Sequence, residues 1–218
     1  MPLEFTKEYR QNVAPLMQQL ANLDVVRDMV DGAECVRKEY YWPAGLSRMI
    51  QAPETLIYGA LATRDNLPIV PLVFKWQCGC TPKHLNAKAY SSSFKERLQA
   101  GTSTDLRVPG LSMVQFLGSG LKFESTLGVD SSSTSLGDSG PVAVHPGVSA
   151  ALLDDITARL TFSNAPNKTT FTANFQLDYL APVPIDSFVV MDAWITAREG
   201  RKTFVYSHLA HALSGQML

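Results

Sequence analysis

Cysteine is scarce in this chain, which has three cysteines among its 218 residues. Cys35, Cys78 and Cys80 are too few for a disulfide framework, and the last two stand too close in sequence to bridge easily. Together with nearby His84 they still lack the second ligand pair that a zinc site uses. We therefore expect reduced thiols and no bound metal.

The sequence also lacks an excess of charge and any long apolar run. Its 19 basic and 20 acidic residues give a formal net charge of −1, which creates no attraction to nucleic acid or to an anionic membrane surface. No stretch approaches the roughly 18 apolar residues of a membrane span, and the N-terminus has no basic region followed by an apolar run. We expect a cytoplasmic protein with no membrane span and no nucleic-acid partner.

Several common motifs are missing. The sequence has no internal repeat, no glycine-rich phosphate loop and no Gly-x-Ser-x-Gly elbow. These absences disfavour nucleotide-binding and α/β-hydrolase classes, and we expect no cofactor. A hydrophobic share of 45% is enough for one sizeable core.

The pattern along the chain predicts a main domain at residues 51–218 behind an N-terminal helical extension at 1–50. Apolar periodicity within residues 4–38 predicts one or two helices that stop near Gly32. We interpret them as a structural cap on the domain, with a lid over the site as the alternative. The serine-rich run within 128–141 cannot bury surface and predicts a flexible loop.

Residues 145–164 predict one helix, and we expect the domain to be organised around it. Pro146 suits a first helical turn, and Ser163 to Pro166 is a plausible stop. One stripe is apolar and faces a core: Val148, Leu152, Ile156 and Leu160. A second face is small except for one acid, and it comprises Gly147, Ala150, Ala151, Asp154 and Ala158.

The two acids of this helix have different interpretations. Asp154 lies on the face of small residues, where another backbone or a ligand has room to approach, and we predict a catalytic or substrate-orienting role for it. Asp155 stands four residues before Arg159, the spacing of a solvent-exposed ion pair.

The C-terminal third of the chain predicts antiparallel strands. Residues 169–180 alternate apolar and polar side chains, as in a half-buried strand. A second strand follows at 188–198, and Glu199-Gly200 turns the chain into a third at about 202–210. Within residues 55–76, the stretches 55–58 and 69–74 predict at least one early strand or buried segment, and residues 111–117 predict a strand. The fold class is therefore α+β, an antiparallel sheet wrapped around a helix.

The order of short motifs resembles the hotdog-fold thioesterases, in particular the PaaI-like members of the acyl-CoA thioesterase superfamily and their fungal representatives. Over residues 110–211 these motifs are Phe116-Leu-Gly-Ser-Gly-Leu121, His145-x-Gly147, the acid Asp154, Tyr179-Leu-Ala-Pro182 and Glu199-Gly-Arg-Lys202. The resemblance implies a hotdog fold, homodimers with active sites at the subunit interface, and hydrolysis of acyl thioesters.

The resemblance also implies residue roles. The acid nine residues after the motif histidine, here Asp154, acts as general base or nucleophile, and Thr172 helps to place the attacking water. A backbone N–H at the helix start holds the carbonyl oxygen. Arg198, Arg201 and Lys202 at the hairpin either meet the phosphates of coenzyme A or are only solvated turn charges. His145 either orients the acyl carbonyl or a water, or caps the helix.

This chain departs from the family's His-Gly-Gly motif at its middle position, because Pro146 has no N–H. Losing one oxyanion donor typically costs about 100- to 1000-fold in rate. Gly147 and Val148 still carry N–H groups at the helix start, which predicts a shifted oxyanion site.

Three functions from different classes stay open. The first is hydrolysis of an acyl thioester on coenzyme A or an acyl carrier protein, including a polyketide. The second is proton abstraction by Asp154 in biosynthesis, leading to dehydration, isomerisation or cyclisation. The third is acyl binding without catalysis.

Overall fold

The computed structural model describes residues 7–31, 36–38, 61, 63, 65–69, 71–76, 84, 109–123, 142–165 and 170–218. The predicted loop at 128–141 and the Cys78 and Cys80 pair lie outside these residues, as does Cys35. The proposed division at residue 50 stays a prediction. In chain order the elements are α1 (Lys7–Asn22), α2 (Asp24–Asp31), β1 (Val36–Lys38), β2 (Leu72–Trp76), β3 (Gly110–Leu117), η3 (Ser119–Leu121), β4 (Lys122–Phe123), β5 (Ala143–Val144), α5 (Pro146–Asn164), β6 (Ser187–Glu199) and β7 (Lys202–His211).

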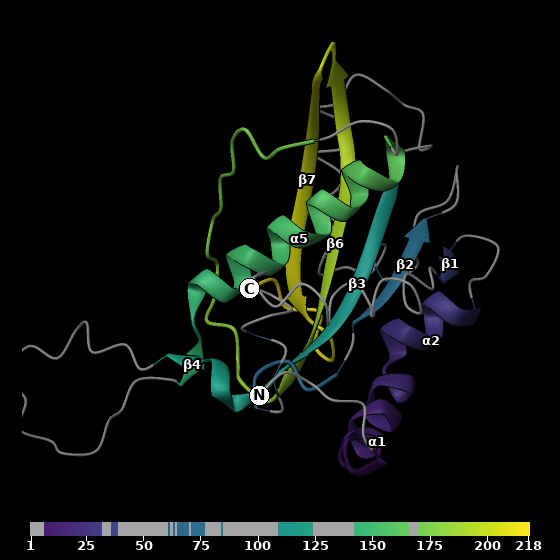
Figure 1. Cartoon of the computed structure of the whole chain (residues 1–218), viewed down its shortest axis with the longest axis vertical. Helices are drawn as coiled ribbons and strands as arrows, with labels where there is room; N and C mark the ends of the chain where they lie inside the picture. Colours follow the sequence, from purple (N-terminus) through teal and green to yellow (C-terminus); the bar gives the residue numbers. More distant parts are fainter. Residues whose placement is uncertain are drawn as a thin grey trace, which may run out of the picture.

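The main sheet is antiparallel, with the strand order β1-β2-β3-β6-β7 in the described part of the chain. Helix α5 crosses one face of β3, β6 and β7, whereas α1 and α2 lie near the β1 and β2 end (Figure 1). This arrangement confirms the predicted α+β class, with a sheet packed on a central helix and a helical N-terminal extension.

Alternation along β6 divides the core between the two faces of the sheet. Odd-numbered residues such as Val189 and Met191 join the apolar stripe of α5 in one buried cluster. Even-numbered residues such as Val190 and Trp194 join α1 and α2 in the other. The N-terminal helices therefore pack on the face away from α5, as a structural cap does, and not over Asp154.

The predicted helix and hairpin are confirmed. Helix α5 buries Leu152, Ile156 and Leu160 almost completely, and each such side chain contributes roughly 1.5–3 kcal/mol relative to exposure. Strands β6 and β7 pair through the turn at Gly200, whose positive φ of 58° suits glycine.

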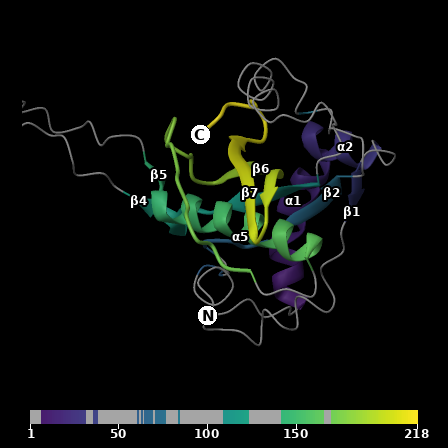
Figure 2. The same cartoon turned by 90° about the horizontal axis from the view of Figure 1, so that it is seen from above.

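The predicted strand at 169–180 is wrong. Residues 170–180 are extended, but they pair with no strand among the described residues. Phe171, which the alternation assigned to a buried face, is 87% exposed. This segment instead runs beside α5, toward its N-terminal end (Figures 1 and 2). Hydrogen bonds to the helix hold the segment.

The glycines of the Phe116 to Leu121 motif allow two backbones to approach each other. The N–H of Gly118 donates to the carbonyl of Asn66 at 2.7 Å, and that of Gly120 donates to the carbonyl of Asp65 at 2.8 Å. A Cβ on Gly118 would lie 2.3 Å from the carbonyl oxygen of Asp65. The motif therefore fixes the end of β3 against residues 65–66.

Gly118→Ala is expected to lower the free energy of unfolding by about 1–3 kcal/mol, because the added methyl group forces the two backbones apart. Urea unfolding followed by circular dichroism measures the change. Ser119→Ala, at the exposed neighbouring position, is the control. An unchanged midpoint for Gly118→Ala would contradict this close approach.

Candidate functional site

The N-terminus of α5 is capped by the side chain just before it. His145 Nδ1 accepts a hydrogen bond from the backbone N–H of Gly147 at 2.9 Å. The ring of Phe123 on β4 meets the His145 ring edge to face, with 4.9 Å between centroids. Of the two predicted roles for His145, the contacts favour the helix cap.

The shifted oxyanion site predicted at Gly147 and Val148 is not open in this structure. The N–H of Gly147 is engaged by His145 Nδ1, and that of Val148 donates to the carbonyl of His145 at 2.8 Å. Pro146 has no N–H. His145 Nδ1 accepts from the first N–H after Pro146, so both expected groups are occupied.

Asp154 lies on the outer side of α5, away from the sheet. The hydroxyl of Thr172, which was predicted on a strand of the sheet, donates to Asp154 Oδ1 at 2.8 Å. The carboxylate is only partly buried, so water or a ligand can reach it. The structure thus brings together the two residues to which the sequence assigned the reacting water.

The extended segment meets α5 at three points along the small-residue face. Besides the bond to Asp154, Thr170 lies 3.4 Å from Thr161 between hydroxyl oxygens. The hydroxyl of Tyr179 donates to the carbonyl of Pro146 at 3.3 Å. The small side chains let a second backbone approach the helix, and that backbone carries three hydroxyl groups to it.

Asp155 forms the predicted ion pair, but not on an exposed surface. Arg159 Nε donates to its Oδ2 at 2.6 Å, and the two side chains are only 19% and 17% exposed respectively. Burial, followed by the charge of neighbouring Asp154, raises the pKa of Asp155 to about 7. The ion pair with Arg159 favours the charged form and opposes this rise. A solvent-exposed interpretation of this pair was therefore wrong.

The predicted coenzyme A contacts lie apart from the helix start. Arg201 and Lys202 are exposed at the β6–β7 turn, which lies beyond the C-terminal end of α5 (Figure 1). His145 and Gly147 mark the opposite end of that helix. Within one chain these cations and the helix start do not form one site.

If the protein hydrolyses thioesters, as the resemblance implies, Thr172→Val is expected to lower kcat roughly tenfold, because the carboxylate of Asp154 loses the hydroxyl that orients it. Steady-state thiol release measures the effect. Thr172→Ser keeps a hydroxyl and is expected to retain most of the activity. Equal rates for Val and Ser would show that the hydrogen bond has no part in the reaction.

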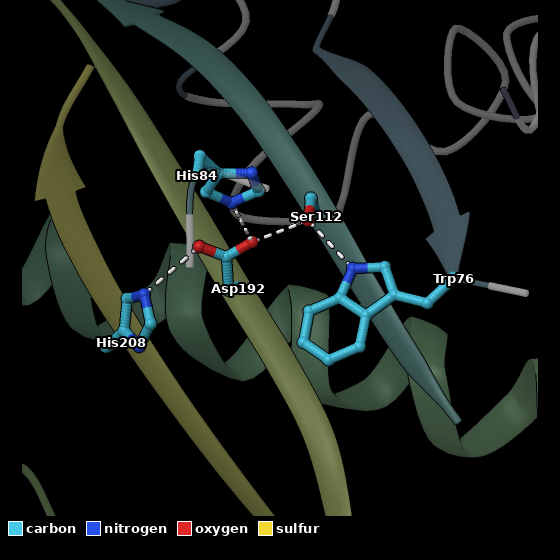
Figure 3. A network of polar contacts seen from close by, with 5 residues as sticks. All are labelled: Trp76, His84, Ser112, Asp192 and His208. Atoms are coloured by element: carbon cyan, nitrogen blue, oxygen red, sulfur yellow. Dashed lines mark hydrogen bonds and ion pairs between the residues drawn. The ribbon is translucent and has the colours of Figure 1, made fainter. Parts of the chain in front are cut away.

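A second polar cluster, absent from the sequence prediction, lies in the other core. Asp192 on β6 is fully buried, and Figure 3 shows its two carboxylate oxygens between three donors. His84 Nε2 at 3.0 Å and Ser112 Oγ at 2.5 Å contact Oδ1, and His208 Nε2 contacts Oδ2 at 3.0 Å. Trp76 Nε1 donates to Ser112 Oγ at 2.9 Å.

Sheet register creates this cluster. Ser112, Asp192 and His208 are direct partners on β3, β6 and β7, so they form one row across the sheet. Since an ionised carboxylate only accepts hydrogen bonds, both histidines must carry a proton on Nε2. The acid in the otherwise apolar run of β6 indicated that a buried carboxylate needs hydrogen-bond partners. The sequence could not identify these partners, because they are distant along the chain.

The ionised form of Asp192 is strongly favoured. Burial by itself raises the pKa of Asp192, but the charges and hydrogen bonds of His84 and His208 outweigh burial and hold this pKa well below its ordinary range. The cluster lies on the face of the sheet opposite α5. We therefore assign it to the stability of the sheet and not to the chemistry at Asp154.

Comparison with known proteins identifies the C-terminal region. The family model described as the thioesterase superfamily matches residues 143–217, which hold α5, β6 and β7. Over this region the chain matches the thioesterase superfamily, and the predicted hotdog resemblance is confirmed.

Two curated proteins are similar over short stretches. MIOREX complex component 3 of Saccharomyces cerevisiae is 30% identical over 66 residues, which cover 30% of this chain and 24% of that protein. Acyl-coenzyme A thioesterase THEM4 of Rattus norvegicus is 37% identical over 65 residues, 30% of this chain and 27% of that protein. The chain thus spans about a quarter of the length of these relatives. No solved structure gives a significant match.

Among the residues that the structure describes, no group of three or more His, Cys, Asp or Glu side chains is arranged to hold a metal ion. None of the helices described is both long and apolar enough to cross a bilayer.

Proposed function

We propose that this protein hydrolyses acyl thioesters of coenzyme A or of an acyl carrier protein, with Asp154 as the general base. The observation that carries the proposal is the Thr172 to Asp154 hydrogen bond of 2.8 Å on the open side of α5. The match of residues 143–217 to the thioesterase superfamily and the similarity to an acyl-coenzyme A thioesterase support the reaction class.

In the proposed reaction Asp154 takes a proton from a water molecule as the water oxygen bonds to the acyl carbon. The carbonyl electron pair moves onto its oxygen, and collapse of the adduct breaks the carbon–sulfur bond. The proton held by Asp154 passes to the leaving sulfur, so that one water yields one acid and one thiol. Thr172 orients the carboxylate throughout.

We further propose a homodimer and a cytoplasmic location. Strand β7 is an edge of the sheet among the described residues, and its first residues are exposed. Phe171 and Leu180 on the extended segment are exposed apolar side chains that a second copy would cover. In such a dimer, Arg201 and Lys202 of one copy would face a site on its partner, because within one chain they lie apart from the helix start.

One observation favours a second candidate function. Because the N–H groups of Gly147 and Val148 are occupied, a polarised carbonyl has no free donor among these backbone groups. Removal of a proton by Asp154, leading to dehydration, isomerisation or cyclisation, forms no tetrahedral adduct at the thioester carbon, so the occupied N–H groups count more directly against hydrolysis than against this function. Acyl binding without turnover is the remaining alternative.

The test is thiol release from a panel of acyl-CoA and acyl-carrier thioesters that differ in chain length and aromatic content. Continuous release with at least one substrate supports hydrolysis. A changed acyl product without free thiol, detected by mass spectrometry, supports proton abstraction. Saturable binding of acyl-CoA with neither product would leave a binding protein and overturn the proposal.

A further inference from the structure

We propose that the phenol hydroxyl of Tyr179 holds the carbonyl oxygen of the thioester and replaces the backbone N–H that Pro146 lacks. This inference rests on the proposed hydrolytic function and adds a catalytic residue to it. In the sequence, Tyr179 was named only as the first residue of the Tyr179-Leu-Ala-Pro182 motif.

The start of α5 leaves a need for such a donor. Among its first three residues, Pro146 has no N–H, Gly147 donates to His145 Nδ1 at 2.9 Å, and Val148 donates to the His145 carbonyl at 2.8 Å. A tetrahedral adduct carries negative charge on the former carbonyl oxygen, and hydrolysis is slow unless a placed donor meets that charge. None of these three backbone groups supplies a free donor for the oxyanion.

Tyr179 supplies a hydroxyl at this place. Its oxygen lies 3.3 Å from the carbonyl oxygen of Pro146, beyond the usual range of roughly 2.5–3.0 Å for O–H···O bonds. This long bond is weak, so the hydroxyl can turn to a better acceptor at little cost. The side chain is 57% exposed, and a ligand that arrives from solvent can reach it.

The position relative to Asp154 fits a hydrolytic reaction. Eight residues of helix place the Cα atoms of Pro146 and Asp154 roughly 12 Å apart along the axis. Helical carbonyls point toward the C-terminus and side chains tilt toward the N-terminus, so the two functional groups approach each other. The remaining interval, roughly one to one and a half turns, accommodates a water molecule about 3 Å from the acyl carbon, and the bonded carbonyl oxygen then lies about 3 Å from the Tyr179 hydroxyl.

One segment therefore positions both the residue that orients the base and the donor to the oxyanion. Residues 170–180 bring Thr172 to Asp154, where the water is deprotonated, and Tyr179 to the helix start, where the oxyanion forms. As the water oxygen bonds to the acyl carbon, the tyrosine hydroxyl leaves the Pro146 carbonyl and donates to the new oxyanion. When the carbon–sulfur bond breaks and the carbonyl reforms, the hydroxyl returns, with no net proton transfer from Tyr179.

Tyr179→Phe removes only this hydroxyl and is the direct test. We expect kcat for thiol release to fall about 100-fold or more, the typical effect of one lost oxyanion donor, while KM changes by less than a few-fold. A trifluoromethyl ketone analogue of the best acyl-CoA substrate, whose hydrate resembles the adduct, is expected to bind weaker by a similar factor. A purely structural role would not make analogue affinity follow kcat.

Tyr206→Phe is the matched control, because Tyr206 packs against the core on the other face of the sheet, and its activity is expected to stay within twofold of wild type. Full kcat in Tyr179→Phe, alongside an inactive Asp154→Asn, would overturn this inference and leave the proposed function intact. If wild-type protein releases no thiol from any substrate, both are overturned. An equal loss in Tyr179→Phe and Tyr206→Phe would also overturn the specific role of Tyr179.

Discussion

Thiol release by Asp154→Asn is expected to fall by roughly 100- to 10,000-fold, the range that a lost general base gives. The asparagine oxygen can still accept the hydrogen bond from Thr172, so the geometry of α5 and the extended segment is kept. What is lost is the ability to take a proton from water. Single-turnover and steady-state assays with a chromogenic thiol reagent measure the loss, and an unchanged melting temperature shows that folding is not the cause.

Two other carboxylates serve as comparisons for this variant. Asp178→Asn makes the same change at an exposed position of the extended segment and is expected to retain activity. Asp155→Asn tests the neighbouring acid, whose side chain points to Arg159. Activity that survives in Asp154→Asn but disappears in Asp155→Asn would move the base to residue 155.

Asp192→Asn is expected to have the largest effect on stability, a loss of about 3–5 kcal/mol, as when one partner of a buried ionic group is removed. The side-chain amide keeps one acceptor but places N–H donors against the ring N–H of His84 or His208. Those buried donors then lose their hydrogen bonds. Equilibrium urea unfolding at pH 7 measures the change, with Asp178→Asn as the exposed control.

The pH dependence of this stabilisation follows from the direction of the Asp192 shift. A carboxyl whose pKa is lowered by folding stabilises the folded protein above its unfolded pKa of about 3.9, and this contribution is lost as pH falls toward the folded value. The difference between wild type and Asp192→Asn is therefore expected to persist from pH 8 to 5 and to shrink below about pH 4. A difference that vanished near pH 6 would contradict an ionised Asp192 as its source.

The sequence predicted the elements whose pattern is local. The four-residue spacing from Val148 to Leu160 and the glycine turn at Gly200 are each sufficient to define α5 and the β6–β7 hairpin. The motif order around Asp154 predicted the thioesterase resemblance and the proximity of Thr172. The sequence could not determine where Thr172 would lie relative to a sheet, since alternation fits any extended chain whether or not it is paired.

The cap at His145 was one of two roles that the sequence left open, and the choice between them depends on the rotamer of the ring. The remaining features depend on the arrangement of distant segments. The cluster around Asp192 needs the register of β3, β6 and β7 together with a residue 108 positions away. A single acid within an apolar strand predicts burial of charge, but its partners follow only from the three-dimensional structure.

The row across β3, β6 and β7 also bears on the order of folding. His208 lies 16 residues from Asp192, whereas Ser112 and His84 lie 80 and 108 residues away. Closing such large loops costs entropy before their contacts form, so the α5 and hairpin region is expected to assemble first and the polar row to close late. The instability of Asp192→Asn should then be seen mainly as faster unfolding, with the refolding rate nearly unchanged in stopped-flow measurements.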